Sequence, residues 1–224
     1  MNKIKKAVSR ILIFLGCALI ITSIVLIIYC TFAEVRANNS VNAVRDEVIL
    51  QIPNYAETIV IKNKKNNNKS ENEVVPIYEI APEMDMKSVT VYNETAEIEL
   101  NYIGILRIPS LGLELPIADE WSYDNLNYAP CCFSGSAYNK GFVICAHNYV
   151  SHFGRLSEAS LEDEVVFTDC DGNNFIYKIE SIDVLEPTDV EKMISDEYDL
   201  TLFTCNFTGQ ARLAVRCMKN EDQD

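Results

Sequence analysis

The sequence predicts a mainly β domain, a closed barrel or a sandwich, behind a single N-terminal transmembrane helix. Two patterns carry this prediction: an uncharged apolar stretch near the N-terminus, and a succession of short β-prone runs and turns after residue 99. The composition excludes other classes. With 224 residues, 48% apolar, and a net charge of −14, the chain is neither a disordered tail, a small disulfide-stapled module nor a basic nucleic-acid binder.

The transmembrane helix is expected over residues 11–33, because no charged residue lies between Arg10 and Glu34. A helix of that length spans about 34 Å, enough to cross the hydrocarbon core. Every charge before it is positive, so residues 1–10 are expected in the cytoplasm and the rest outside the cell. A cleavable signal peptide is disfavoured, since its apolar stretch would be only about 7 to 15 residues. A lipoprotein modified at Cys17 is disfavoured because the apolar run continues far beyond that residue.

Residues 34–98 are expected to form an extracellular stalk. The apolar periodicity of residues 41–52 favours a short helix, whereas residues 62–73 contain no apolar side chain and can bury nothing. Alternation in residues 88–100 resumes a strand pattern. We therefore expect the functional domain to occupy residues 99–224.

This domain is expected to consist of short strands separated by turns. Asp171-Gly172, between two β-prone runs, is typical of a hairpin, and only residues 153–160 and 188–195 favour short helices. Seven or eight strands in about 120 residues indicate a closed barrel or a sandwich. The runs rich in β-branched and aromatic residues are 101–108, 113–118, 142–146, 164–170, 174–185, 198–205 and 211–218.

Any imidazole-dependent chemistry must use one of only two histidines. His147 ends the strand-like run GFVICA and opens a loop, where a scaffold presents reactive groups. His152 lies further along that loop and is expected at the surface, with no special role. For His147 a purely structural role stays open at this point.

Cys205 is the candidate nucleophile among eight cysteines. It ends the alternating run DLTLFTC, and a turn-prone Asn-Phe-Thr-Gly separates it from the run that contains Arg212. A strand–turn–strand arrangement would bring Arg212 close to the Cys205 thiol. A guanidinium in that position favours the thiolate and can donate hydrogen bonds to a substrate carbonyl oxygen. Arginine cannot act as a base, which leaves proton transfer to His147. Cys131 and Cys132 lie in a loop-like stretch, and no C-x-x-C spacing predicts a zinc or redox site.

Five short segments add specificity through their order and spacing. They are Gly104-Ile-Leu-Arg-Ile-Pro109, Leu113-Glu-Leu-Pro116, Gly135-Ser-Ala137 ahead of Ala146-His147, Thr201-Leu-Phe-Thr-Cys205, and Ala211-Arg-Leu-Ala-Val215. Together they resemble the sortases, the membrane-anchored cysteine transpeptidases of Gram-positive bacteria. The resemblance covers the chain from Ile103 to about Arg216.

The resemblance implies an eight-stranded closed β-barrel with Cys205 at the end of the seventh strand and Arg212 on the eighth. It also implies that Cys205 is the nucleophile, His147 the catalytic histidine, and Arg212 the arginine that stabilises the substrate and the tetrahedral intermediate. The implied reaction cleaves an LPxTG-like sorting signal between Thr and Gly through a thioacyl enzyme. An amine of a peptidoglycan precursor, or of a pilin in pilus-building members, then resolves that intermediate.

The class that this sequence resembles is the small, single-anchor type, similar to class D. Only about ten residues, 187–196, separate the sixth and seventh expected strands, where sortases usually build substrate specificity. The absence from the sequence of a second hydrophobic segment and of an Asp-Pro-aromatic lid motif argues against the pilin-polymerising class. Ala146 stands where many sortases have Gly before the histidine.

Two further residues are assigned to substrate binding. Pro116 is expected to line or support the groove, and Thr204, next to the nucleophile, to help the oxyanion hole; an ordinary strand threonine is an equal alternative. No cofactor or metal is expected. Asp169 and Asp171 could bind calcium, but Asp in a hairpin turn commonly uses its carboxylate for backbone hydrogen bonds.

Other classes remain as alternatives. A non-catalytic, membrane-tethered β-barrel that binds or assembles partners would explain anchor, stalk and strands without chemistry. A pilin-assembling sortase would use the same residues with another acceptor. A papain-like hydrolase is disfavoured, because its nucleophile opens a helix and precedes the histidine, whereas His147 precedes Cys205 here.

Overall fold

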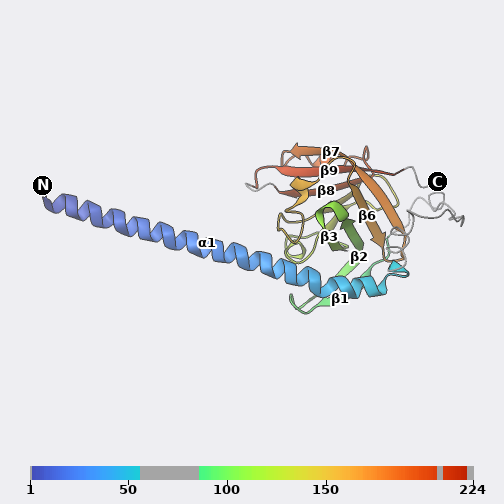
Figure 1. Ribbon diagram of the computed structural model, residues 1–224, viewed down its shortest axis with the longest axis horizontal. Coiled ribbons are helices and arrows are strands. Elements are labelled where there is room, and N and C mark those ends of the chain that lie inside the picture. The colour runs from blue at the N-terminus through green and yellow to red at the C-terminus, as the bar shows by residue number, and fades with distance from the viewer. Residues whose placement is uncertain (1, 56–85, 206–208, 221–224) are drawn as a thin grey trace, which may run out of the picture.

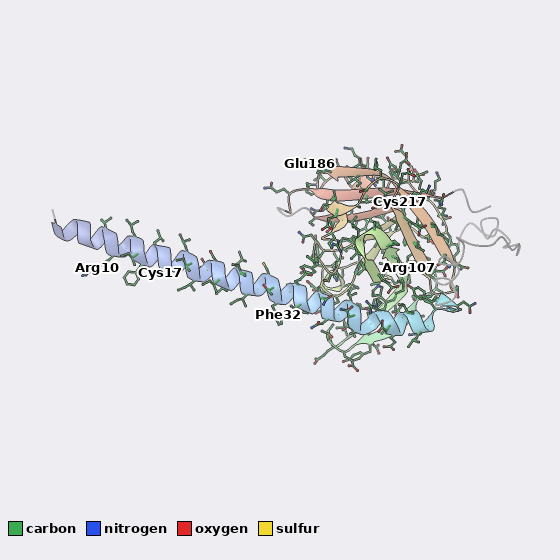
Figure 2. All side chains as sticks on the ribbon, in the orientation of Figure 1. Arg10, Cys17, Phe32, Arg107, Glu186 and Cys217 are labelled. Atoms are coloured by element: carbon green, nitrogen blue, oxygen red, sulfur yellow. The ribbon has the colours of Figure 1, made fainter. Side chains whose placement is uncertain are left out.

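The computed structural model describes residues 2–55, 86–205 and 209–220, and shows one long helix leading into a β-barrel (Figure 1). Helix α1 spans Asn2–Gln51 without a break. The expected polar linker at residues 62–73 lies outside the described residues. In the apolar half of α1, side chains such as Cys17 and Phe32 stand clear of the barrel (Figure 2). That half is long and apolar enough to cross a membrane.

Eight strands close the barrel, as the resemblance implied. Each strand is hydrogen-bonded to its neighbour in the order β2-β3-β4-β5-β8-β9-β7-β6, and β6 pairs with β2 again to complete the ring. A ninth strand, β1, pairs only with the first part of β2. The strands are β1 (Val89–Asn93), β2 (Ile98–Ile108), β3 (Leu113–Ala118), β4 (Cys131–Ser134), β5 (Phe142–Cys145), β6 (Glu164–Asp169), β7 (Asn174–Leu185), β8 (Leu200–Cys205) and β9 (Arg212–Lys219).

The ring closes where two backbones come unusually near each other. Gly104 of β2 faces Asp169 of β6, and a Cβ on Gly104 would lie 2.2 Å from the carbonyl oxygen of Thr168. No other residue fits without separating the strands. The glycine that opens the first sortase-like segment therefore has a structural reason.

Two expectations about the smaller elements differ from the structure. Cys131 and Cys132, expected in a loop, lie on strand β4, which has only four residues. The two expected helices shrink to one turn each, the 3-10 helix Leu156–Glu158 and α3 (Val190–Met193). Two more 3-10 turns are Pro109–Leu111 and Asn125–Asn127.

The second half of α1 packs onto the outer face of β1, β2 and β3, where a stalk was expected. Its buried side chains recur every three or four residues: Val41, Val44, Val48 and Ile52. They cover an apolar surface on the strands. This difference arises because the apolar stripe of the helix gains the most hydrophobic free energy when it is buried against an apolar sheet face. The residues that bury this interface are Ala37, Val41, Val44, Val48, Ile52 and Tyr55 of the helical segment and Val91, Tyr102, Ile105 and Ala118 of the strands.

Candidate active site

A groove of about 370 Å³ lies on the outer face of the barrel, beside strands β5, β8 and β9. His147, Cys205 and Arg212 all line it. Glu186, which also lines the groove, lies at the end of the barrel turned toward the apolar half of α1 (Figure 2). The three residues that the sequence selected for chemistry thus share one concave surface.

Cys205 reaches the groove because of its place in strand β8. Side chains alternate between the two faces of a strand; Leu200 and Leu202 enter the barrel core, whereas Phe203 and Cys205 face outward into the groove. The thiol is half-buried. Cys205 is the last residue of β8 and lies directly opposite Arg212 in the antiparallel pairing with β9.

Arg212 begins strand β9 and is held by its own turn. Its guanidinium donates to the carbonyl oxygens of Gly209 at 3.2 Å and Ala211 at 3.3 Å. These bonds use one guanidinium nitrogen, Nη1. A guanidinium presents five N–H donors, so others can point at a bound carbonyl oxygen.

His147 follows strand β5, which runs parallel to β8 and aligns Cys145 with Phe203. The imidazole is half-buried, and burial lowers the pKa of His147 below its ordinary value of 6.5. The ring is therefore mainly neutral at neutral pH and able to accept a proton. Its ring centroid lies 4.9 Å from that of Tyr149.

The other thiols of the barrel are poorly suited to nucleophilic attack. Burial raises the pKa of Cys131 to about 12, and burial raises the pKa values of Cys132 and Cys170 to about 11. Burial also raises the pKa of Cys145, which lies at the groove but is almost fully covered. A thiol held protonated is a weak nucleophile.

Aromatic side chains that the sequence reasoning did not select build one wall of the groove. Trp121 packs on Phe133 with ring centroids 5.2 Å apart, and Phe133 meets Phe203 edge-on at 5.2 Å. Tyr123 stands at the rim, 5.8 Å from Trp121. The residues come from one loop and two strands, so no periodic pattern in the sequence connects them.

Neither Pro116 nor Thr204 lines this groove. Thr204 is buried and alternates with Cys205, so it faces the barrel interior, where its hydroxyl has no hydrogen-bond partner among the described residues. Pro116 lies on β3, on the strand face that carries Glu114. The Glu114 carboxylate accepts a hydrogen bond from Tyr55, which follows α1.

His152 differs from the expectation of a surface residue. Its side chain is fully buried, neither ring nitrogen has a partner among the described residues, and burial lowers its pKa to about 3. The loop turns inward here because the amide of His152 donates to Tyr149 O at 2.9 Å and that of Phe153 to His147 O at 3.1 Å.

The acidic hairpin uses its carboxylate within the turn. Asp169 accepts from the amides of Asp171 at 3.0 Å and Asn173 at 2.8 Å, and from the Tyr138 hydroxyl. Over residues 2–55, 86–205 and 209–220, no group of three or more His, Cys, Asp or Glu side chains is arranged to hold a metal ion. The Asp169 carboxylate is thus bonded within the hairpin and to Tyr138.

Comparisons with known proteins agree on the fold. A sequence model of the sortase domain matches residues 106–220. Among solved structures, a lid mutant of sortase A from Corynebacterium diphtheriae is 25% identical, with a TM-score of 0.50 over 55% of this chain and 73% of that chain. A Clostridium perfringens sortase D5 transpeptidase is 24% identical, with a TM-score of 0.48 over 53% and 79%. No curated protein matches the chain.

Proposed function

Because this chain belongs to the sortase family of cysteine transpeptidases, we propose that Cys205, His147 and Arg212 form its catalytic centre. One observation carries the proposal: the three side chains come from the end of β8, the end of β5 and the start of β9, and line a single groove. The directly opposed positions of Cys205 and Arg212 add to it. A thiol, an imidazole and a guanidinium are the groups that acyl transfer through a thioester requires.

The proposed reaction begins when the Cys205 thiol loses its proton to His147 and attacks the carbonyl carbon of the Thr–Gly bond. Arg212 donates hydrogen bonds to the oxyanion of the tetrahedral intermediate. The imidazolium of His147 then gives its proton to the leaving glycine amine, which leaves a thioacyl enzyme. An acceptor amine attacks the thioester, loses a proton to His147, and releases Cys205 as the leaving thiolate.

The proposed substrate is a protein with an LPxTG-like sorting signal. The aromatic wall of Trp121, Phe133 and Phe203 offers an apolar surface for the Leu-Pro portion of such a peptide. The proposed acceptor is an amine of a peptidoglycan precursor. A pilin lysine is the competing acceptor, and a small class D-like type remains our class prediction.

The proposed setting is the outer face of the cell membrane. The apolar half of α1 is a candidate membrane span, and the basic residues before it favour a cytoplasmic N-terminus. The barrel would then work outside the cell, where cell-wall precursors and sorting signals meet.

The test uses the full chain in detergent micelles with a panel of LPxTG-like peptides and hydroxylamine as the acceptor. We expect amine-dependent cleavage between Thr and Gly that disappears in Cys205→Ala, and thioacyl enzyme detectable by mass spectrometry before the amine is added. His147→Ala and Arg212→Ala should each lose on the order of 10²-fold or more in kcat/KM.

Cys132→Ala provides the matched control, since Cys132 is also half-buried but lies on β4 away from the groove lining. It should retain activity. Full activity of Cys205→Ala would reject the proposed centre. Hydrolysis with no transfer to hydroxylamine, a peptidoglycan-type amine or a pilin lysine peptide would point to a protease instead.

A further inference from the structure

A carboxylate of α1 is bonded to the loop that carries the candidate catalytic histidine. We define the histidine loop as residues 147–154. The Glu34 carboxylate accepts hydrogen bonds from the backbone amides of Val150 at 3.1 Å and Ser151 at 3.0 Å. One carboxylate oxygen serves each amide. Charge-assisted bonds of this kind are stronger than neutral ones, so the contact fixes the middle of the loop.

The histidine loop is closed on itself, so a constraint at Val150 and Ser151 acts on the whole loop. Two amides, those of His152 at 2.9 Å and Gly154 at 2.8 Å, donate to the carbonyl oxygen of Tyr149. The amide of Phe153 donates to His147 O at 3.1 Å. A Cβ at position 154 would come within 2.5 Å of Asn148 O, which shows how tightly the chain turns.

The constraint reaches the imidazole through an aromatic contact. The ring of Tyr149, directly before the two clamped amides, lies 4.9 Å from the ring of His147 and 5.5 Å from that of His152. His152 is fully buried, so the side of Tyr149 away from His147 packs against a side chain that has little room to move. A shift at Val150 would therefore move Tyr149 and change the orientation of His147.

Glu34 is itself held in place by the docking of α1. Ala33 and Ala37, one position before and three after it, are buried. The Arg36 guanidinium lies over the Tyr128 ring at 5.5 Å from its centroid. Glu34 is also the first charged residue after the apolar stretch. The hydrogen bonds between Glu34 and the histidine loop thus lie at the junction between the candidate membrane span and the barrel.

We propose that Glu34 is a positioning residue for His147: its carboxylate holds the histidine loop, so the junction of α1 with the barrel sets the geometry of the active site. This inference rests on the proposed function, in which His147 transfers protons. It assigns Glu34 no direct contact with substrate. Proton transfer demands a well-placed imidazole, so a small displacement of His147 slows the reaction.

The experiment compares Glu34→Gln and Glu34→Ala with the unchanged full chain in nanodiscs, using peptide and hydroxylamine. We expect kcat to fall about tenfold for Glu34→Gln and on the order of 10²-fold for Glu34→Ala, with KM nearly unchanged. Glu47→Gln is the matched control, because Glu47 is an exposed carboxylate further along the same helix; it should leave kcat unchanged.

A pH profile separates positioning from a merely structural role. Burial lowers the pKa of His147, so a loosened, better solvated loop should move the acidic limb of kcat/KM to higher pH. A structural role alone would reduce the folded fraction and the melting temperature without moving that limb.

The possible outcomes distinguish this inference from the proposed function. Unchanged kcat and pH profile in Glu34→Ala, together with an inactive His147→Ala, would overturn the role of Glu34 and leave the catalytic centre intact. An active Cys205→Ala would instead overturn the centre. A lowered kcat in Glu34→Gln with an unchanged acidic limb and a lowered melting temperature would reduce Glu34 to a stabilising contact.

Discussion

Two outer faces of the same barrel differ in whether another part of the chain covers them. The face of β1, β2 and β3 is covered by α1, and Tyr102 and Ile105 on it are fully buried. The face near β5, β8 and β9 is left open as a groove, where Trp121 is 38% and Tyr123 is 77% exposed. Both faces are rich in apolar side chains.

The difference indicates that the covered face contributes mainly to the stability of the fold and the open face mainly to binding. Apolar surface removed from water stabilises the fold in proportion to its area, so the covered face contributes to folding. Exposed aromatic residues beside a half-buried thiol contribute little to folding and mark a binding surface. Substitutions on the two faces should therefore affect different measurements.

The largest contrast should come from two arginines. Arg212→Ala on the open face should lower kcat/KM about 10²- to 10³-fold with little change in melting temperature, because under the proposed mechanism the oxyanion would lose its hydrogen-bond donor. Arg45→Ala on the covered face should leave kcat/KM unchanged. There the Arg45 Nε atom lies 3.9 Å from Oε2 of Glu114. Similar losses of activity in both variants would remove the distinction between the faces.

Acid should lower the stability of the folded chain through His152, in the loop that follows β5. His152 has a pKa of about 3 in the folded chain and an ordinary value of 6.5 when unfolded, so the unfolded state binds more protons between these values. Stability is therefore fully present above pH 6.5 and falls by ~1.4 kcal/mol per pH unit as the pH drops toward 3. In His152→Phe this loss should disappear, as urea unfolding at several pH values would show; parallel curves for both proteins would contradict it.

Packing on the covered face should matter for stability alone. Val48→Ala removes two buried methyl groups and should cost about 2 kcal/mol of unfolding free energy, with unchanged kcat per folded molecule. Leu50→Ala, two residues further along α1 and 85% exposed, should cost almost nothing. Equal effects on urea unfolding would show that α1 does not pack as described.

The smallest effect is expected at the rim of the groove. Tyr123→Ala should raise KM for an LPxTG-like peptide a few-fold, equivalent to less than about 1 kcal/mol, and leave the melting temperature unchanged. Tyr92→Ala on β1 is the control, since Tyr92 is also exposed, at 51%, but lies outside the groove. A change of KM in the control alone would place peptide binding elsewhere.

Much of the barrel was predictable because its strands carry local patterns. Leu113–Ala118 and Asn174–Leu185 begin and end as their β-branched and aromatic content indicated. Strand β4 was missed because its four residues, CCFS, are too short for alternation to be visible. Likewise the apolar periodicity of residues 41–52 predicted a helix but not the surface that it packs against, since no local pattern in a helix identifies the sheet face that it will cover.

The candidate site was predictable only where one residue type is scarce or a motif surrounds it. His147 stands out because the chain has only two histidines, and Cys205 because the segment Thr201-Leu-Phe-Thr-Cys205 surrounds it. The bond from Glu34 to Ser151 joins residues 117 positions apart through a backbone amide, so the sequence carries no trace of it. His152 was placed at the surface because polarity is a local property, whereas burial depends on how the loop folds.

The continuity of α1 limits how this protein can meet its partners. The helix runs from the candidate membrane span into the docked segment without a break, and side chains are already buried against the barrel at Ala33. If residues 11–33 lie in a bilayer, as proposed, no flexible tether separates the membrane from the barrel. Under the proposed function, the search for substrate would then be two-dimensional: encounters would depend on lateral diffusion in the membrane plane, and only sorting signals presented at one fixed height would be within reach.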